Sequence, residues 1–232
     1  MKEKSSPFLK ILSVVAAIAL AHLFSLIPFS VENDAKGFDG DTSKSGFVEM
    51  SPTGNDVQLI FSETERAEID GAVKQAAEKL QMNILVYASR SPLSDYDTEF
   101  FCDDNYDEMY GPDTDGIFYY MDLSGKSPAY DYLSTSGKAI LAYQAAKDNI
   151  FYALDKYLPS SVDVQANGLE PYKEGIAGAV HEFLDQIDSY SVESVVSYTG
   201  KEPSGTFYGS RTGKYVYYQG GTLCVTKSRP PK

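Results

Sequence analysis

Residues 110–137 read YGPDTDGIFYYMDLSGKSPAYDYLSTSG, and this stretch decides the fold. It opens with an acidic loop at residues 111–115, which is followed by an uninterrupted apolar run at residues 116–121. Because polar and apolar residues do not alternate in this run, it predicts a central strand that is covered on both faces. The acidic loop would then be held at one end of a rigid strand, where ligand and ion sites are often found.

Patterns on both sides of this stretch predict the other elements. Ser62 and Glu65 form a capping box before a helix, whose buried stripe repeats at helical spacing. A short strand at 83–88, a helix from Ser94 to about 110, a second hairpin strand at 129–134, a helix at 138–158 and a helix from Pro171 to about 190 follow. The order is αβαββαα, so the fold class is α/β, a three-layer αβα sandwich with a small mixed sheet.

The composition divides the chain into four predicted parts. Residues 1–31 are a membrane anchor or signal, residues 32–56 a flexible polar linker, residues 57–191 the α/β domain, and residues 192–232 a basic tail rich in Gly and Tyr. In the tail, two strand-like runs flank a Gly-Gly pair, which predicts a β-hairpin. This hairpin either docks on its own domain or binds a partner, because an isolated hairpin is barely stable.

The N-terminal segment predicts an extracytoplasmic location. Lys2, Lys4 and Lys10 precede an apolar run at residues 11–29, which is long enough to span a bilayer as a single transmembrane helix in contact with membrane lipid. The alternative is a signal peptide that is cleaved after the Ala-Leu-Ala sequence at 19–21. In both cases the C-terminal domain lies outside the cytoplasm, either membrane-bound or secreted.

The overall composition excludes several classes of function. A formal net charge of −13 argues against a nucleic-acid partner, since phosphates require a basic surface. Only two histidines and two cysteines occur, which disfavours zinc sites, histidine-based nucleophile chemistry and a disulfide scaffold.

The remaining chemical signal is a group of carboxylates: Asp103 and Asp107 on the predicted helix, and Asp113 and Asp115 in the acidic loop. Asp103 and Asp107 are four residues apart and so share a helix face. Carboxylate oxygens in a flexible loop favour a hard divalent cation, with Ca²⁺ preferred to Mg²⁺. The alternative interpretation is an ordinary solvated acidic surface. The EF-hand pattern that begins at Asp103 lacks its required glycine and glutamate.

Residues 62–190 resemble the TPM domain family, on the basis of the segments SETERAEIDGAVKQAAEKL, NILVYA, EFFCDDNYDEMYG, DTDGIFYYMDL and YDYLSTSGKAI. The resemblance implies an extracytoplasmic, often membrane-tethered domain. It also implies weak phosphatase activity, binding of calcium or other divalent cations, or an accessory role in a membrane-protein complex. The loop reads Asp-Thr-Asp-Gly where family members commonly have Asp-Asn-Gly, Asp-Asp-Gly or Arg-Asp-Gly, so either aspartate can take the family's position.

Two hypotheses follow. The first is a membrane-anchored accessory factor that binds a divalent cation through the four aspartates. The second is a weak, metal-assisted phosphomonoesterase that uses the same carboxylates, in which metal ions position water and polarise phosphate. The residues identify no catalytic group, although Lys138 is a candidate for gripping phosphate.

Overall fold

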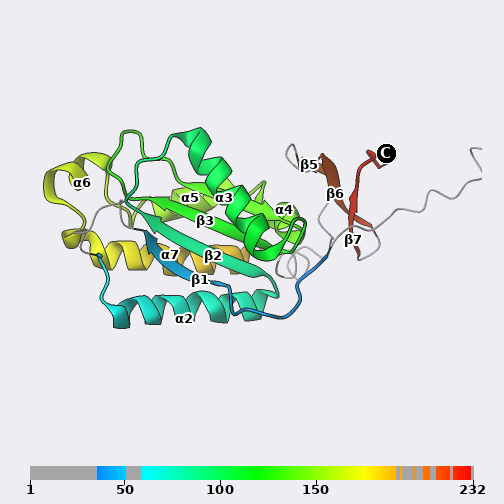
Figure 1. Cartoon of the computed structure of the whole chain (residues 1–232), viewed down its shortest axis with the longest axis horizontal. Coiled ribbons are helices and arrows are strands. Elements are labelled where there is room, and N and C mark those ends of the chain that lie inside the picture. Colours follow the sequence, from blue (N-terminus) through cyan, green and yellow to red (C-terminus); the bar gives the residue numbers. More distant parts are fainter. Residues whose placement is uncertain are drawn as a thin grey trace, which may run out of the picture. The chain divides into compact units, whose positions relative to one another are not determined.

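The computed structural model describes residues 36–50, 59–191, 194, 201, 206–209, 213–219 and 222–230. Contacts divide the chain into residues 1–32 and 33–232, so every described residue belongs to the second unit. The predicted α/β class is confirmed: a mixed four-stranded sheet is flanked by helices, and a small three-stranded antiparallel sheet follows (Figure 1). The predicted anchor or signal at residues 1–31 lies outside the described residues.

The larger sheet has the strand order β1-β2-β3-β4. Its strands are β1 (Gly46–Met50), β2 (Asn83–Ser89), β3 (Gly116–Asp122) and β4 (Tyr132–Ser136). The first three strands are parallel, and β4 pairs with β3 in the antiparallel direction. All residues of β3 are buried, which confirms the central strand that its unbroken apolar run predicted.

Helices cover β3 from two sides. Ile117, Tyr119 and Met121 belong to the main core, which they share with α2 (Glu63–Leu80), α5 (Lys147–Leu154) and α7 (Lys173–Ser189). On the other face, Phe118 and Tyr120 pack with residues of α3 (Asp95–Tyr110). A single strand therefore anchors both cores, because its successive side chains point to opposite faces of the sheet.

The folded domain begins earlier than predicted. Residues 46–50, which the sequence analysis assigned to the flexible linker, form β1 and pair with β2. Its five residues include only three apolar side chains, so the pattern was hidden in a polar segment. The outer edge of β1 is held by side chains: the Phe47 N–H donates to Asp70 Oδ1 at 3.0 Å, and the Glu49 carboxylate accepts the N–H groups of Ile60 and Phe61.

The helix predicted at 138–158 is wrong as a single element. It is divided into α4 (Lys138–Tyr143) and α5 by a turn, and α6 (Ser161–Asn167) follows before the helix that was predicted from Pro171. The division lets α4 and α5 contact different partners: Leu141 joins a cluster with the C-terminal sheet, whereas Ile150 lies in the main core. A 3-10 turn, η1 (Glu170–Tyr172), then precedes α7.

The C-terminal strands are β5 (Thr206–Gly209), β6 (Lys214–Gln219) and β7 (Thr222–Thr226), paired in that order and antiparallel. The predicted hairpin is thus confirmed, together with a third strand. Val216 and Val225 are buried with Leu141 of α4, which shows that the tail packs on its own domain.

Candidate functional site

The acidic loop lies at the amino-terminal end of β3, next to the carboxyl end of the antiparallel β4. In open α/β sheets, ligands usually bind outside the carboxyl ends of the parallel strands. The loop therefore lies at the opposite end of the strands from the one that this rule favours. Its chemistry depends on what its carboxylates contact.

Asp115 holds the start of α4. Its Oδ1 atom accepts the backbone N–H of Lys138 at 2.8 Å. This contact needs glycine at position 137, where φ is +57° and a Cβ atom would lie 2.2 Å from Asp115 Oδ1. The ammonium group of Lys138 in turn donates to the carbonyl of Leu80 at 2.8 Å, at the end of α2. Lys138 thus links the loop to two helices and is engaged within the fold.

Asp113 pairs with the C-terminal sheet. Its backbone has a positive φ of 64°, and its Oδ2 atom lies 2.5 Å from Lys214 Nζ, the first residue of β6. Only 9% of the Asp113 side chain and 19% of the Lys214 side chain are exposed. The cation that the loop carboxylate contacts therefore comes from a residue 101 positions later in the sequence.

The two aspartates of α3, Asp103 and Asp107, have different partners from Asp113 and Asp115. Asp103 Oδ1 accepts the hydroxyl of Ser134 on β4 at 2.5 Å. The backbone carbonyl of Asp107 accepts the N–H of Gly111, the C-cap residue of α3, at 2.8 Å. Tyr106, between them, donates its hydroxyl to the Thr114 carbonyl at 3.2 Å and so fixes the acidic loop against α3.

These contacts bear on the predicted cation site. Across residues 36–50, 59–191 and the described parts of the tail, no group of three or more His, Cys, Asp or Glu side chains is placed to hold a metal ion. As arranged, Asp113, Asp115 and Asp103 accept hydrogen bonds from an ammonium, a backbone N–H and a hydroxyl, respectively, rather than forming one shared ligand set. The arrangement does not fit a calcium cage, and calcium binding stays a prediction.

A small cavity of about 260 Å³ lies beside the acidic loop. It is lined by both signs of charge, and the lining residues include Lys36, Asp39, Asp41, Lys44 and Thr114. Lys44 Nζ donates to the Met109 carbonyl at 2.7 Å. This cavity was not predicted from the sequence, because its lysines and aspartates lie in the segment that was assigned to the linker.

A second group of carboxylates, which was not predicted, lies at the carboxyl end of β3. Asp131 accepts the hydroxyl of Tyr119 at 2.6 Å and the N–H of Asp122 at 2.8 Å. Burial raises the pKa of Asp131 to about 6, and the charges of Asp122 and Asp155 contribute in the same direction. Asp122 accepts the N–H groups of Ser124 and Tyr130, so these side chains organise the β3–β4 connection.

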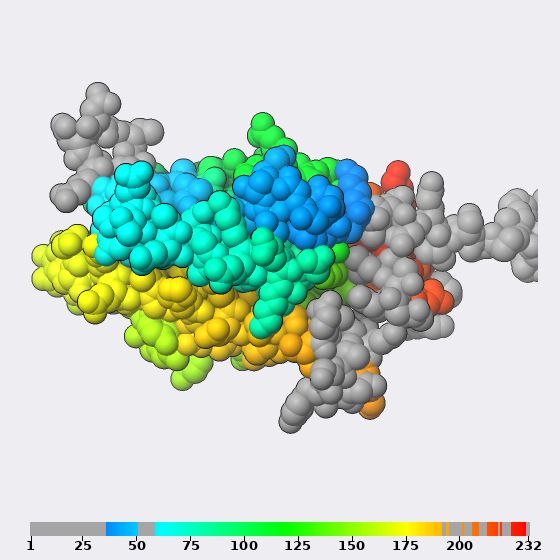
Figure 2. All heavy atoms as spheres, turned by 90° about the horizontal axis from the view of Figure 1, so that it is seen from below, coloured from blue at the N-terminus to red at the C-terminus, as the bar shows by residue number. Residues whose placement is uncertain are grey.

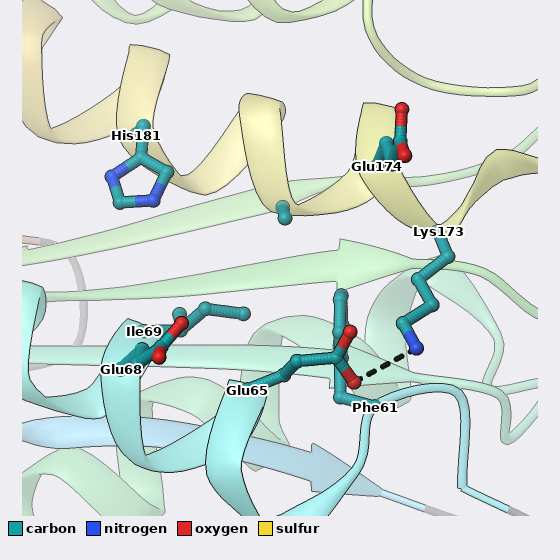
Figure 3. Close-up of a pocket in the computed structure, with 8 residues that line it drawn as sticks. Phe61, Glu65, Glu68, Ile69, Lys173, Glu174 and His181 are labelled. Atoms are coloured by element: carbon teal, nitrogen blue, oxygen red, sulfur yellow. Dashed lines mark ion pairs between the residues drawn. The ribbon is translucent and has the colours of Figure 1, made fainter.

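Helices α2 and α7 lie side by side (Figure 2). A shallow groove of about 320 Å³ lies between their amino-terminal halves (Figure 3). Lys173 and Glu65 form an ion pair across it at 2.8 Å, while His181 of α7 points toward α2. Hydrogen bonds from Lys173 and Ser62 lower the pKa of the Glu65 carboxyl to about 2. An ion pair thus connects the two helices across the groove.

The outer face of α3 exposes a pair of aromatic rings. Tyr96 is 67% exposed and Phe100 is 45% exposed, and their ring centroids are 4.4 Å apart. The helix carries seven acidic side chains and no lysine or arginine. Phe100 does not face the sheet, because the buried face of α3 is formed by Thr98, Cys102 and Tyr106.

None of the helices in the described part of the chain has the length and apolar character needed to cross a bilayer. Comparison of the sequence with models of known protein families finds no match, and comparison with curated proteins finds none either. The resemblance to the TPM family therefore stays a prediction that rests on the segments quoted above.

Proposed function

We propose that this chain is a TPM-like, three-layer accessory domain that is tethered outside the cytoplasm by its apolar N-terminal segment and binds a protein partner without catalysing a reaction. The observation that carries the proposal is the exposed Tyr96–Phe100 pair within the acidic face of α3. Single exposed apolar residues need no explanation. Two aromatic rings that contact each other and are surrounded by acidic side chains, however, form a recognisable binding surface.

The chemistry of this face favours a cationic segment of a membrane-protein partner. An arginine or lysine that lies over an aromatic ring gains cation–π attraction, and nearby carboxylates add electrostatic steering. Because α3 has no positive side chain of its own, a basic partner meets no like-charge repulsion from the helix. The same face disfavours nucleic acid and anionic lipid headgroups.

The contacts of the acidic loop support a role in architecture. Asp115 positions α4, and Asp113 pairs with the C-terminal sheet. A metal-assisted phosphomonoesterase needs carboxylates that converge on metal ions and a group that grips phosphate. Lys138, the candidate for that grip, donates to the Leu80 carbonyl. These contacts favour the accessory function over the enzymatic alternative.

The binding surface can be tested on the full chain in detergent with an arginine-rich peptide as the probe. The double variant Tyr96→Ser/Phe100→Ser should bind the peptide several-fold more weakly than the wild type. Tyr152→Ser is the matched control, since Tyr152 is 81% exposed on α5 and lies outside the proposed surface. Equal peptide affinity for the double variant and the wild type would contradict the proposal.

A second measurement addresses the enzymatic alternative. Hydrolysis of p-nitrophenyl phosphate by the same preparation, with calcium or magnesium present, should not exceed the uncatalysed rate. Rapid hydrolysis that the Asp113→Asn/Asp115→Asn variant abolishes would identify the chain as a phosphomonoesterase instead. A protease accessibility assay on spheroplasts with a C-terminal tag tests the tether: the tag should be degraded.

A further inference from the structure

Asp113 and Lys214 form an ion pair whose burial sets it apart from an ordinary surface pair. Exposed pairs contribute little to stability because solvent screens them. In a buried pair, loss of one partner leaves an uncompensated charge, which is strongly destabilising. With a 9% exposed carboxylate and an ammonium 2.5 Å away, this pair belongs to the second class.

The position of Lys214 in its strand explains how the pair forms. Residues two apart in a strand share a face, so Lys214 lies on the same face of β6 as Val216. Val216 and Val225 are buried against Leu141, in the helix whose first N–H is held by Asp115. The apolar contact and the ion pair therefore hold the same face of the C-terminal sheet at two neighbouring places, α4 and the acidic loop.

From this arrangement we infer that Lys214 is a built-in cation that takes the place of a metal ion at the acidic loop and locks the C-terminal sheet onto the α/β domain. The negative charge of the buried Asp113 carboxylate, which a bound cation would otherwise have to compensate, is balanced by an ammonium from the chain itself. The stability of the loop and of the docked sheet is then independent of calcium.

The test compares melting temperatures of the full chain in detergent, with a chelator and with millimolar calcium. Because the chain contains no tryptophan, Phe207→Trp introduces a single fluorescent reporter next to the cluster of Leu141, Val216 and Val225. In this background, Lys214→Met removes the ammonium but keeps most of the side-chain stem. Lys227→Met is the matched control, because Lys227 is exposed in the same tail.

The melting temperature of the reporter protein should be the same with and without calcium. Lys214→Met and Asp113→Asn should each lower the transition seen by tryptophan by about 5 °C or more, whereas Lys227→Met should not. The double variant should lose no more than the worse single variant, since the two residues act as one pair. Stabilisation of the wild type in step with calcium concentration, or fully additive losses in the double variant, would overturn the inference.

Discussion

The carboxyl group of Asp131 joins the β3–β4 connection to the central strand through the Tyr119 hydroxyl and the Asp122 N–H. Both contacts stabilise the loop, but the carboxylate is enclosed and has two other acidic residues, Asp122 and Asp155, within electrostatic range. Its pKa is therefore raised from 3.8 to about 6, chiefly by burial. This single residue makes the folded state prefer a bound proton.

We expect a measurable pH dependence from Asp131. A folded-state pKa above the unfolded value gives stability that is fully present below about pH 4 and is lost as the pH rises through about 6. Relative to Asp131→Asn, the wild type should lose about 2 kcal/mol of unfolding free energy between these limits. Urea unfolding of both proteins across this range measures the difference. A constant difference between the two proteins would show that the carboxyl titrates normally.

Gly137 is a residue beside the acidic loop whose replacement would both strain the backbone and clash with Asp115. Its φ is +57°, and an added Cβ would lie 2.2 Å from Asp115 Oδ1 and 2.9 Å from the Asp115 backbone. Gly137→Ala should lower the unfolding free energy by about 2 kcal/mol or more, measured by chemical denaturation. Gly71→Ala in α2 is the control, since a Cβ there meets nothing and alanine favours the helix. A loss as large at Gly71 would contradict the explanation.

At the scale of elements, β3 carries the fold because it is buried on both faces. Ile117 is fully buried, so an aspartate there would place an unpaired carboxylate inside the main core. This costs several kcal/mol against a total stability of about 5–15 kcal/mol. Ile117→Asp should therefore abolish cooperative thermal unfolding, as followed by circular dichroism. Val48→Asp, at a 37% exposed position of β1, should still unfold cooperatively.

The success of sequence-based prediction followed the strength of each local pattern. The run at 116–121 is apolar throughout, and the capping box of Ser62 and Glu65 is present as expected. By contrast, β1 has five residues with polar neighbours, and its pairing to β2 depends on a contact across the fold that no local pattern reports. The division between α4 and α5 has the same cause, since α4 turns toward the distant β6.

The site was predicted less completely than the fold for a similar reason. The loop and its aspartates are in the expected connection between α3 and β3. The loop aspartates contact the Lys214 ammonium and the Lys138 N–H, and Asp103 of α3 contacts the Ser134 hydroxyl, so all three partners lie in other segments of the chain. Spacing along the sequence indicates which carboxylates are near one another. It does not indicate which donor from a distant segment forms a hydrogen bond with each of them.

At the scale of the whole molecule, the α/β domain should fold without the C-terminal tail, but with lower stability. A chain that ends after Ser191 should remain folded and monomeric with a reduced melting temperature, because it exposes Leu141 and leaves the Asp113 carboxylate without its ammonium. Asp113→Asn in the shortened chain should recover part of the loss. Scanning calorimetry and size-exclusion chromatography measure both effects. An insoluble product would mean that the sheet is an obligatory part of the domain.

The hydrogen bond from Phe47 to Asp70 has a consequence for crowded solutions. An edge strand is a template on which another molecule can add its own strand, and side chains that occupy the edge prevent such growth. The approach of Asp70 depends on the glycine at position 46, where a Cβ would lie 2.2 Å from the carboxylate. Asp70→Ala should therefore make light scattering rise with protein concentration, while Asp188→Ala, which removes an exposed ion pair with Lys79, should not. One carboxylate in this way acts as a guard against polymerisation, and its value grows as copies are packed more closely together.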